Sequence, residues 1–228
     1  MAETANRRPI RQRDSSWARW LARRLAGAGA SPDLISAASA AAATLAGALL
    51  LTAGGAPAVW LRALFFVGAG ACIQLRLLCN LLDGMVAVEH GRGSPAGPIW
   101  NELPDRYSDV VALVCAGYAA RLEGAPSSDA LGWTCAVLAL ATAYLRELGR
   151  GLGFPADFSG PFAKQQRMMA LTLAAAVSAL EPLWGWRGQT LTLALIVIAA
   201  GTALTVARRT LTLARRLAAR ADERRGKE

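Results

Sequence analysis

The chain alternates long apolar runs with short polar connections over most of its length. A helix needs about 17 to 25 mostly apolar residues to cross roughly 30 Å of hydrocarbon. Six stretches approach or reach that length, near residues 34–53, 58–82, 105–120, 130–148, 167–184 and 189–207. The pattern predicts an all-α polytopic membrane protein with six transmembrane helices and no soluble second domain.

Composition and charge predict the orientation of these spans. Hydrophobic residues make up 54% of the chain and charged residues 18%, and the formal net charge of +9 comes mostly from arginines near the two ends. Basic flanks beside apolar spans mark the cytoplasmic side, and an even number of spans places both termini there. We therefore expect a bacterial inner-membrane protein that contacts anionic membrane lipid, with no nucleic-acid partner.

The N-terminal segment carries tryptophans and leucines between arginines, which is typical of an amphipathic helix lying on the inner leaflet. Ser31 and Pro32 then predict the start of the first span, as N-cap and first helical residue. The expected organisation is a juxtamembrane segment, a six-helix transmembrane domain and a basic cytoplasmic tail, at residues 1–30, 31–208 and 209–228. The turns on the other side of the membrane show no polar constellation that predicts a site.

Carboxylates and amides stand at helical spacing at the cytoplasmic ends of the second and third spans. Asn80 and Asp83 are three residues apart, and Asn101, Asp105 and Asp109 follow one another at intervals of four, so each set shares one helix face. Ionisable side chains within membrane segments are costly and mark functional sites. Two facing stripes of oxygen ligands predict a site for a divalent metal.

The spacing of these residues resembles the signature of the CDP-alcohol phosphatidyltransferases, D-x2-D-G-x2-A-R-x8-G-x3-D-x3-D. Laid on this chain, the signature falls with every spacing kept on Asn80, Asp83, Gly84, Ala87, Val88, Gly97, Asn101 and Asp105. Five of the eight residue types match. The departures are two asparagines in place of aspartates and Val88 in place of arginine. The family consists of six-span enzymes, so the resemblance extends to the overall layout.

The resemblance implies transfer of a phosphatidyl group from CDP-diacylglycerol, or a similar CDP-linked donor, to a small polar alcohol, with release of CMP. Mg²⁺ or Mn²⁺ would be held by Asn80, Asp83, Asn101 and Asp105, and Asp105 would be the base that takes the acceptor proton. Each amide in place of a carboxylate removes one negative charge, so we expect a weaker metal site, or one ion instead of two. A second register, with the loop longer by one helical turn, makes Asp109 the catalytic base.

The family resemblance also implies contacts to the nucleotide and to anionic groups of the substrates by Gly84, Ala87, Gly97, Lys164 and Arg167. Arg146 ends an apolar run, where a charge is expected to pair with Glu147 or with a bound anion. Gly84 has no side chain and would let the nucleotide approach the helix backbone. Lys164 and Arg167 are three residues apart, so they can project toward one anion. Arg76, inside the second span, is expected to pair with an acidic residue.

Other functions are less favoured by the sequence. His90 is the only histidine, which excludes a histidine-based triad, and the chain has no P-loop for a nucleotide-driven pump. A catalytically impaired family member that acts in membrane binding or assembly stays an alternative, because the substitutions fall on functional positions. A small transporter would place polar groups near the bilayer midplane instead of at one face. The resemblance implies a homodimer, and the alcohol cannot be read from the sequence.

Overall fold

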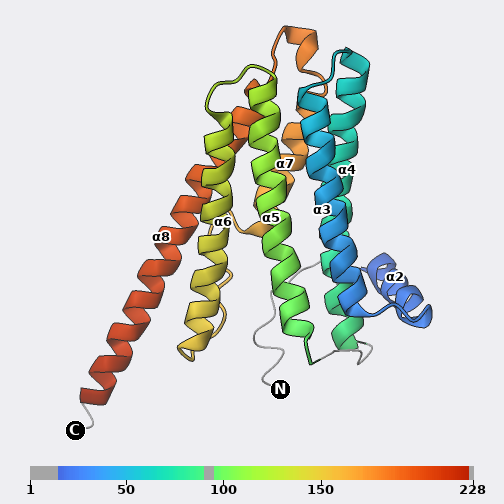
Figure 1. The fold of residues 1–228 in the computed structure, drawn as a ribbon. Helices are drawn as coiled ribbons and strands as arrows, with labels where there is room; N and C mark the ends of the chain where they lie inside the picture. Colours follow the sequence, from blue (N-terminus) through green and yellow to red (C-terminus); the bar gives the residue numbers. More distant parts are fainter. Residues whose placement is uncertain (1–14, 90–94, 226–228) are drawn as a thin grey trace.

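The computed structural model describes residues 15–89 and 95–225, and this part of the chain is built of helices and their connections (Figure 1). The α-helices are α2 (Ser16–Gly27), α3 (Pro32–Gly54), α4 (Val59–Glu89), α5 (Gly97–Leu122), α6 (Ser128–Gly151), α7 (Lys164–Ser178) and α8 (Gln189–Arg225), and the 3₁₀ helix η2 is Glu181–Trp184. The all-α prediction is confirmed for these residues.

The six helices α3 to α8 close into a ring. Helix α3 packs on α4 and α5, α5 packs on α6, and α6 packs on α8, while α7 closes the ring by contacting both α8 and α4 (Figure 1). Apolar side chains from these helices fill the interior, among them Leu50, Phe66, Leu113, Leu171 and Leu195. Polar side chains that point inward therefore face one another across a closed bundle.

Small residues allow the helices to approach closely. A Cβ atom placed on Gly117 of α5 would lie 2.5 Å from the carbonyl oxygen of Ser128 and 2.9 Å from the Cα atom of Gly132 on α6. The two backbones are thus in direct contact, which is the packing that glycine permits between membrane helices.

Four helices are long and apolar enough to cross a membrane, by length and composition: Pro32–Gly54, Val59–Val88, Ser128–Gly151 and Gln189–Arg225. The other two predicted spans fall on α5 and α7. The N-terminal half of α5 carries four charged side chains, Glu102, Asp105, Arg106 and Asp109. Helix α7 ends at Ser178 and has only 15 residues, or about 22 Å at 1.5 Å per residue. The structure therefore supports four of the six predicted spans directly.

The connection before the first span folds as its sequence predicts. The side chain of Ser31 accepts a hydrogen bond of 3.2 Å from the amide of Leu34, and Pro32 is the first helical residue. Helix α2 lies against α4 and buries a face made of alanines, while Trp17 and Trp20 are half exposed. Helix α2 thus turns its alanines toward the bundle and leaves both tryptophans half exposed.

The end of the bundle opposite α2 holds a buried ion cluster, which the sequence analysis missed. The Arg62 guanidinium donates to Glu123 at 3.0 Å and to Glu181 at 2.7 Å, and both carboxylates are fully buried. Glu181 also accepts from the backbone amides of Gly188 and Thr190, at 3.0 and 2.6 Å. The cluster ties α4, the end of α5 and η2 together.

Candidate functional site

Helix α4 brings Asp83 into the half of the bundle where α4 ends and α5 begins. Its carboxylate is 3% exposed and accepts a hydrogen bond of 2.6 Å from the hydroxyl of Ser36 on α3. The amide of Gly84 donates to the other carboxylate oxygen at 2.5 Å. Both donors are neutral, so neither of them compensates the negative charge of an ionised Asp83.

Helix α5 contributes Asp109, which lies between two buried arginines. Arg76 of α4 donates to one carboxylate oxygen and Arg167 of α7 to the other, each at 2.8 Å. All three side chains are only 1% exposed. The expectation that Arg76 pairs with an acidic residue is confirmed, and Asp109 joins three helices of the ring.

Asp105 lies one turn before Asp109 and shares part of this network. Arg76 donates to its backbone oxygen at 3.2 Å and to its carboxylate at 3.3 Å. The ammonium of Lys164 donates to the other carboxylate oxygen of Asp105 and to the side-chain oxygen of Asn80. Asp83 also interacts electrostatically with both Asp105 and Lys164. We call Asn80, Asp83, Asp105 and Asp109, with Arg76, Lys164 and Arg167, the aspartate cluster.

The loop before α7 fixes the position of Lys164. Gly160 has a φ of 119°, and a Cβ atom there would collide with the side chain of Thr205 on α8. The amide of Phe162 donates to the hydroxyl of Thr205 at 3.1 Å, and its carbonyl accepts from Arg167 at 3.0 Å. The loop is therefore held on α8, and it directs the first turn of α7 toward α4 and α5.

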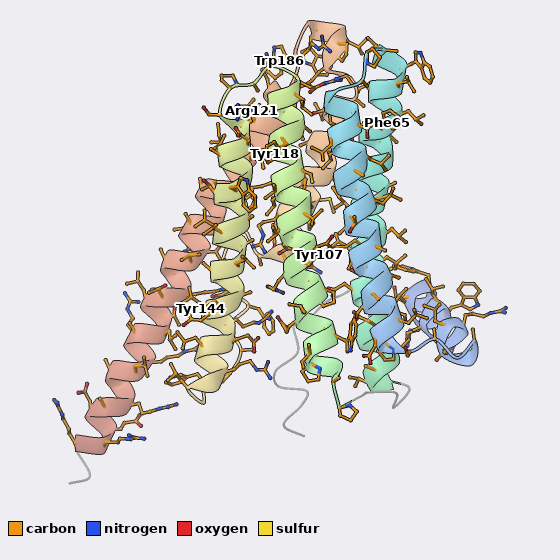
Figure 2. The ribbon with its side chains drawn as sticks, viewed as in Figure 1. Phe65, Tyr107, Tyr118, Arg121, Tyr144 and Trp186 are labelled. Atoms are coloured by element: carbon orange, nitrogen blue, oxygen red, sulfur yellow. The ribbon has the colours of Figure 1, made fainter. Side chains whose placement is uncertain are left out.

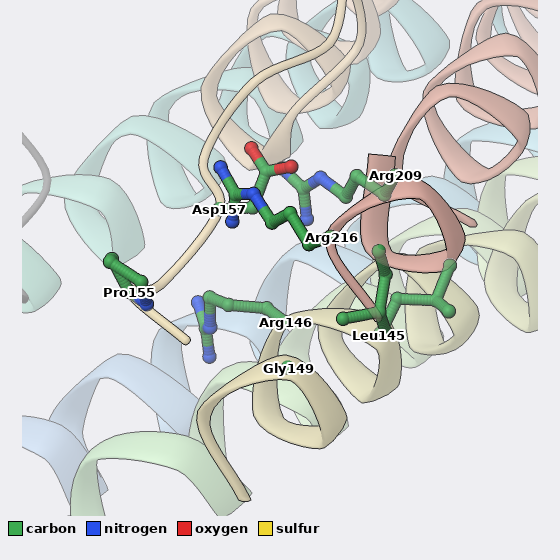
Figure 3. A pocket seen from close by; sticks show the side chains of 8 residues that line it. Leu145, Arg146, Gly149, Pro155, Asp157, Arg209 and Arg216 are labelled. Atoms are coloured by element: carbon green, nitrogen blue, oxygen red, sulfur yellow. The ribbon is translucent and has the colours of Figure 1, made fainter. Parts of the chain in front are cut away.

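A small pocket lies beside the aspartate cluster, where α6, α8 and the loop before α7 meet (Figure 3). Arg146, Asp157, Arg209 and Arg216 line it. Arg209 is held in place by the carbonyl oxygens of Thr142 and Ser159, at 2.7 and 3.0 Å. The pocket is rich in arginine, which suits an anionic ligand.

Asp157 is the acidic member of this pocket. Partial burial opposes its ionisation, but hydrogen bonds from Ser159 and the positive charges of Arg209 and Arg216 hold the pKa of the carboxyl below its usual range. The carboxylate is therefore ionised at neutral pH and partly offsets the arginines around it.

Ion pairs connect the pocket to the aspartate cluster. Arg146 donates to both carboxylate oxygens of Glu102 at 2.5 Å and to Glu147 at 2.8 Å. Glu102 also lies 3.5 Å from Arg106, whose guanidinium is 3.5 Å from Asp105. The expected pairing of Arg146 with Glu147 is confirmed. Its ion pair with Glu102 links the pocket to α5, three residues before Asp105.

No family model matches the chain. A curated relative, the phosphatidylinositol phosphate synthase of Streptomyces avermitilis, is 28% identical over 202 residues, which are 85% of this chain and 76% of the relative. Solved structures of the phosphatidylinositol phosphate synthase of Mycobacterium tuberculosis share the fold at 22% identity. The complex with manganese and citrate has a TM-score of 0.70 and covers 86% of this chain and 88% of that one. The structure with CDP-DAG bound has a TM-score of 0.69 and covers 87% and 94%.

These relatives agree with the resemblance that the motif predicted, since both are synthases of a phosphatidyl lipid. The likeness also extends over most of each chain. It is therefore not confined to the motif on α4 and α5.

The structure brings together most of the predicted site residues. Asn80, Asp83, Asp105, Asp109, Lys164 and Arg167 all belong to the aspartate cluster. Asn101 is exposed on the first part of α5, as is Val88 at the end of α4. Gly84 and Ala87 lie on the last turns of α4 and Gly97 begins α5. Sequence reasoning missed Ser36, Arg209 and Arg216, which come from distant segments and carry no local motif.

Proposed function

We propose that this protein is an integral membrane transferase that moves a phosphatidyl group from CDP-diacylglycerol, or a similar CDP-linked donor, to an alcohol and releases CMP. The observation that carries the proposal is the burial of Asp83 and Asp105 beside Asn80, on two facing helices and at the spacing of the signature. The synthase relatives support this donor, and their name makes inositol phosphate the first acceptor to test.

The membrane arrangement is part of the proposal. Helices α5 and α7 belong to the same closed ring as the four apolar spans, so we place all six of the helices α3 to α8 in the bilayer. Inside the ring, Asp105 and Asp109 of α5 are 8% and 1% exposed, so they face protein instead of lipid. The arginines on α2 and at the end of α8 favour a cytoplasmic location for both ends in a bacterial inner membrane. The half-exposed tryptophans of α2 favour an interfacial position.

The donor set of the cluster fits one divalent ion. Asp83 and Asp105 offer carboxylate oxygens and Asn80 offers an amide oxygen, which are ligands that Mg²⁺ and Mn²⁺ accept. Among the described residues no group of three His, Cys, Asp or Glu side chains is assembled to hold a metal ion. Two carboxylates and one amide supply too little negative charge for a pair of ions, so we propose a single ion. When bound, the ion would neutralise charge on the pyrophosphate of the donor.

Asp105 is the better candidate for the catalytic base. Both oxygens of Asp109 are occupied by arginines and its side chain is 1% exposed. Asp105 is 8% exposed and lies next to Asn80 across the Lys164 ammonium. We propose that Asp105 takes the proton of the acceptor hydroxyl and that Asp109 positions α4, α5 and α7. A carboxylate within hydrogen-bond reach of the hydroxyl is what general-base catalysis requires.

The arginine-lined pocket is the proposed place of the acceptor. Arg216 can pair with a phosphate on the alcohol, whereas Arg146 is already held by Glu102 and Glu147 and Arg209 holds the loop before α7. The pocket is linked through the Arg146–Glu102 ion pair to the turn of α5 that precedes Asp105. We propose that the hydroxyl of an acceptor held there reaches Asp105 from this side. The binding site for the cytidine nucleotide would be lined by Gly84, Ala87 and Gly97, as the resemblance implies.

The test is release of CMP from CDP-diacylglycerol by purified protein in lipid, with Mg²⁺ or Mn²⁺ and with inositol phosphate, glycerol phosphate, serine or inositol as acceptor. We expect release that depends on metal, acceptor and Asp83, and mass spectrometry of the lipid product then names the acceptor. Asp83→Asn removes one negative charge from the aspartate cluster and should reduce CMP release. The matched control is Asp222→Asn, the same exchange on the exposed last turns of α8. The homodimer expected from the resemblance is checked by light scattering on the same preparation.

Failure of folded protein to release CMP with any acceptor would overturn the proposed transfer. Retained binding of a cytidine nucleotide in that case would favour the catalytically impaired alternative, a family member that acts in membrane binding or assembly.

A further inference from the structure

The ammonium of Lys164 lies between the side-chain oxygen of Asn80 and a carboxylate oxygen of Asp105. These are two of the three side chains proposed above to hold a divalent ion. We infer that Lys164 is an internal cation that takes the place of the metal in the metal-free protein and must leave Asn80 and Asp105 before a metal binds. The inference rests on the proposed function only for the choice of metal donors.

Charge balance in the aspartate cluster supports this competition. The cluster contains three carboxylates, Asp83, Asp105 and Asp109, and three cations, Arg76, Lys164 and Arg167. A fourth cation, Arg106, lies 3.5 Å from Asp105 but also 3.5 Å from Glu102, and the negative charge of Glu102 offsets it. A divalent ion added to this set would create an excess of positive charge in a buried place. Like charges a few ångströms apart repel strongly where water is excluded, so one of the three cations has to withdraw.

Lys164 is the cation that can withdraw. Arg76 and Arg167 are 1% exposed, and they hold the two oxygens of Asp109 from opposite sides. The side chain of Lys164 is 19% exposed and extends from the first residue of α7. A lysine ammonium is a compact charge on a flexible stem, whereas a guanidinium is a rigid planar fork. Lys164 can therefore turn toward solvent while its backbone stays anchored by the loop on α8.

Asp83 would remain in place during the exchange. Its two hydrogen bonds come from the hydroxyl of Ser36 and the amide of Gly84, and neither donor has to move for a cation to approach. In the metal-free cluster, Asp83 is therefore available to a metal ion, whereas Asn80 and Asp105 are occupied by Lys164. The expected result is weak metal binding by the wild-type protein and tighter binding once the competitor is removed.

The experiment titrates the full-length protein with Mn²⁺ in nanodiscs of uncharged lipid and follows free Mn²⁺ by electron paramagnetic resonance. Lys164→Met removes the ammonium but keeps an unbranched side chain. Arg121→Met removes one charge at the opposite end of the bundle, where Arg121 is 59% exposed, and is the matched control (Figure 2). We expect the Kd for Mn²⁺ to fall at least about tenfold in Lys164→Met, given the size of the repulsion removed, and to stay unchanged in Arg121→Met.

Two further variants locate the effect. Lys164→Arg keeps the charge, so it should bind Mn²⁺ no tighter than wild type. Combining Lys164→Met with Asp83→Asn should abolish the gain, because the ion loses its anchoring carboxylate. Thermal unfolding of each variant with and without Mn²⁺ provides the folding control, and Mn²⁺ should raise the Tm more in Lys164→Met than in wild type.

The inference is overturned if folded Lys164→Met binds Mn²⁺ no tighter than wild type, including the case in which neither protein binds it. A gain that survives the loss of Asp83 would also contradict it, since the ion would then be elsewhere. The proposed function fails separately. If wild type releases CMP in a metal-dependent way but Lys164→Met binds Mn²⁺ no tighter, only the competition by Lys164 is refuted. If Lys164→Met binds Mn²⁺ tighter but no acceptor supports CMP release, only the proposed transfer is refuted.

Discussion

Asp105 and Asp109 stand one helical turn apart, and their surroundings predict opposite responses to the same substitution. Asp109→Asn leaves the buried guanidiniums of Arg76 and Arg167 without their shared counter-charge. Removing one partner of a buried ion pair costs about 3 to 5 kcal/mol, and here one substitution breaks two pairs. Because whole domains are stable by only about 5 to 15 kcal/mol, we expect Asp109→Asn to be strongly destabilised or unfolded.

Asp105→Asn should instead fold and lose turnover. The amide retains an oxygen that can accept from Lys164, and Arg76 keeps its shorter bond to Asp109, so we expect a cost of about 1 to 2 kcal/mol. The substitution removes the proposed proton acceptor, and loss of a general base typically lowers the rate by about 10² to 10⁴ fold. The two carboxylates are thus distinguished by the property that each substitution lowers, which is stability for Asp109→Asn and turnover for Asp105→Asn.

The assay measures CMP release per folded molecule together with thermal unfolding of the same preparation. Asp105→Asn should show a near-normal Tm and a large loss of kcat, and Asp109→Asn a large loss of Tm. A stable but inactive Asp109→Asn, beside an Asp105→Asn that turns over normally, would refute this assignment and establish the longer register, in which Asp109 is the base.

Three further substitutions test other parts of the structure. Arg62→Met leaves two buried glutamates without their cation and should destabilise the protein by about 3 to 5 kcal/mol, measured by SDS titration in mixed micelles. A loss of stability below about 1 kcal/mol would show that the charges do not hold this cluster together. Gly117→Val should separate α5 from α6 and lower the Tm by several degrees. Gly151→Val, at the end of α6 where no atom lies within 4 Å of the added Cβ, is the milder comparison. Arg216→Met should raise the KM for an anionic acceptor several-fold and leave the KM for the CDP-linked donor unchanged; equal effects on both would remove the pocket from acceptor binding.

Local patterns were sufficient to predict much of this fold. The apolar runs predicted the helices, and Ser31 with Pro32 predicted the start of α3, because both signals depend on neighbours within one turn. The shortness of α7 was not predicted, since the apolar pattern continues through Leu180 into η2 while the helix ends at Ser178. Hydropathy does not distinguish a helix from a turn of similar polarity.

The sequence predicted those parts of the candidate site in which residues share one face of a single helix. Asn80 with Asp83, and Asp105 with Asp109, were paired by spacing alone. The contacts that join the helices were not, because they depend on which faces meet after folding. Arg62 and Glu181 are 119 residues apart in the chain, and Lys164 and Asn80 are 84 apart. A single sequence contains no local signal for such pairs.

The departure at Asn80 and the position of Lys164 form one electrostatic arrangement. With an aspartate at position 80, the cluster would contain four carboxylates against three cations, and the excess negative charge would favour a metal. With asparagine, the carboxylates and cations balance, and the amide oxygen still accepts from the ammonium. Asn80→Asp should therefore raise the affinity for Mn²⁺ even with Lys164 in place, whereas the same exchange at the exposed Asn101 should have a much smaller effect. Equal effects at the two positions would mean that Asn101 also belongs to the metal site, contrary to its exposure in this structure.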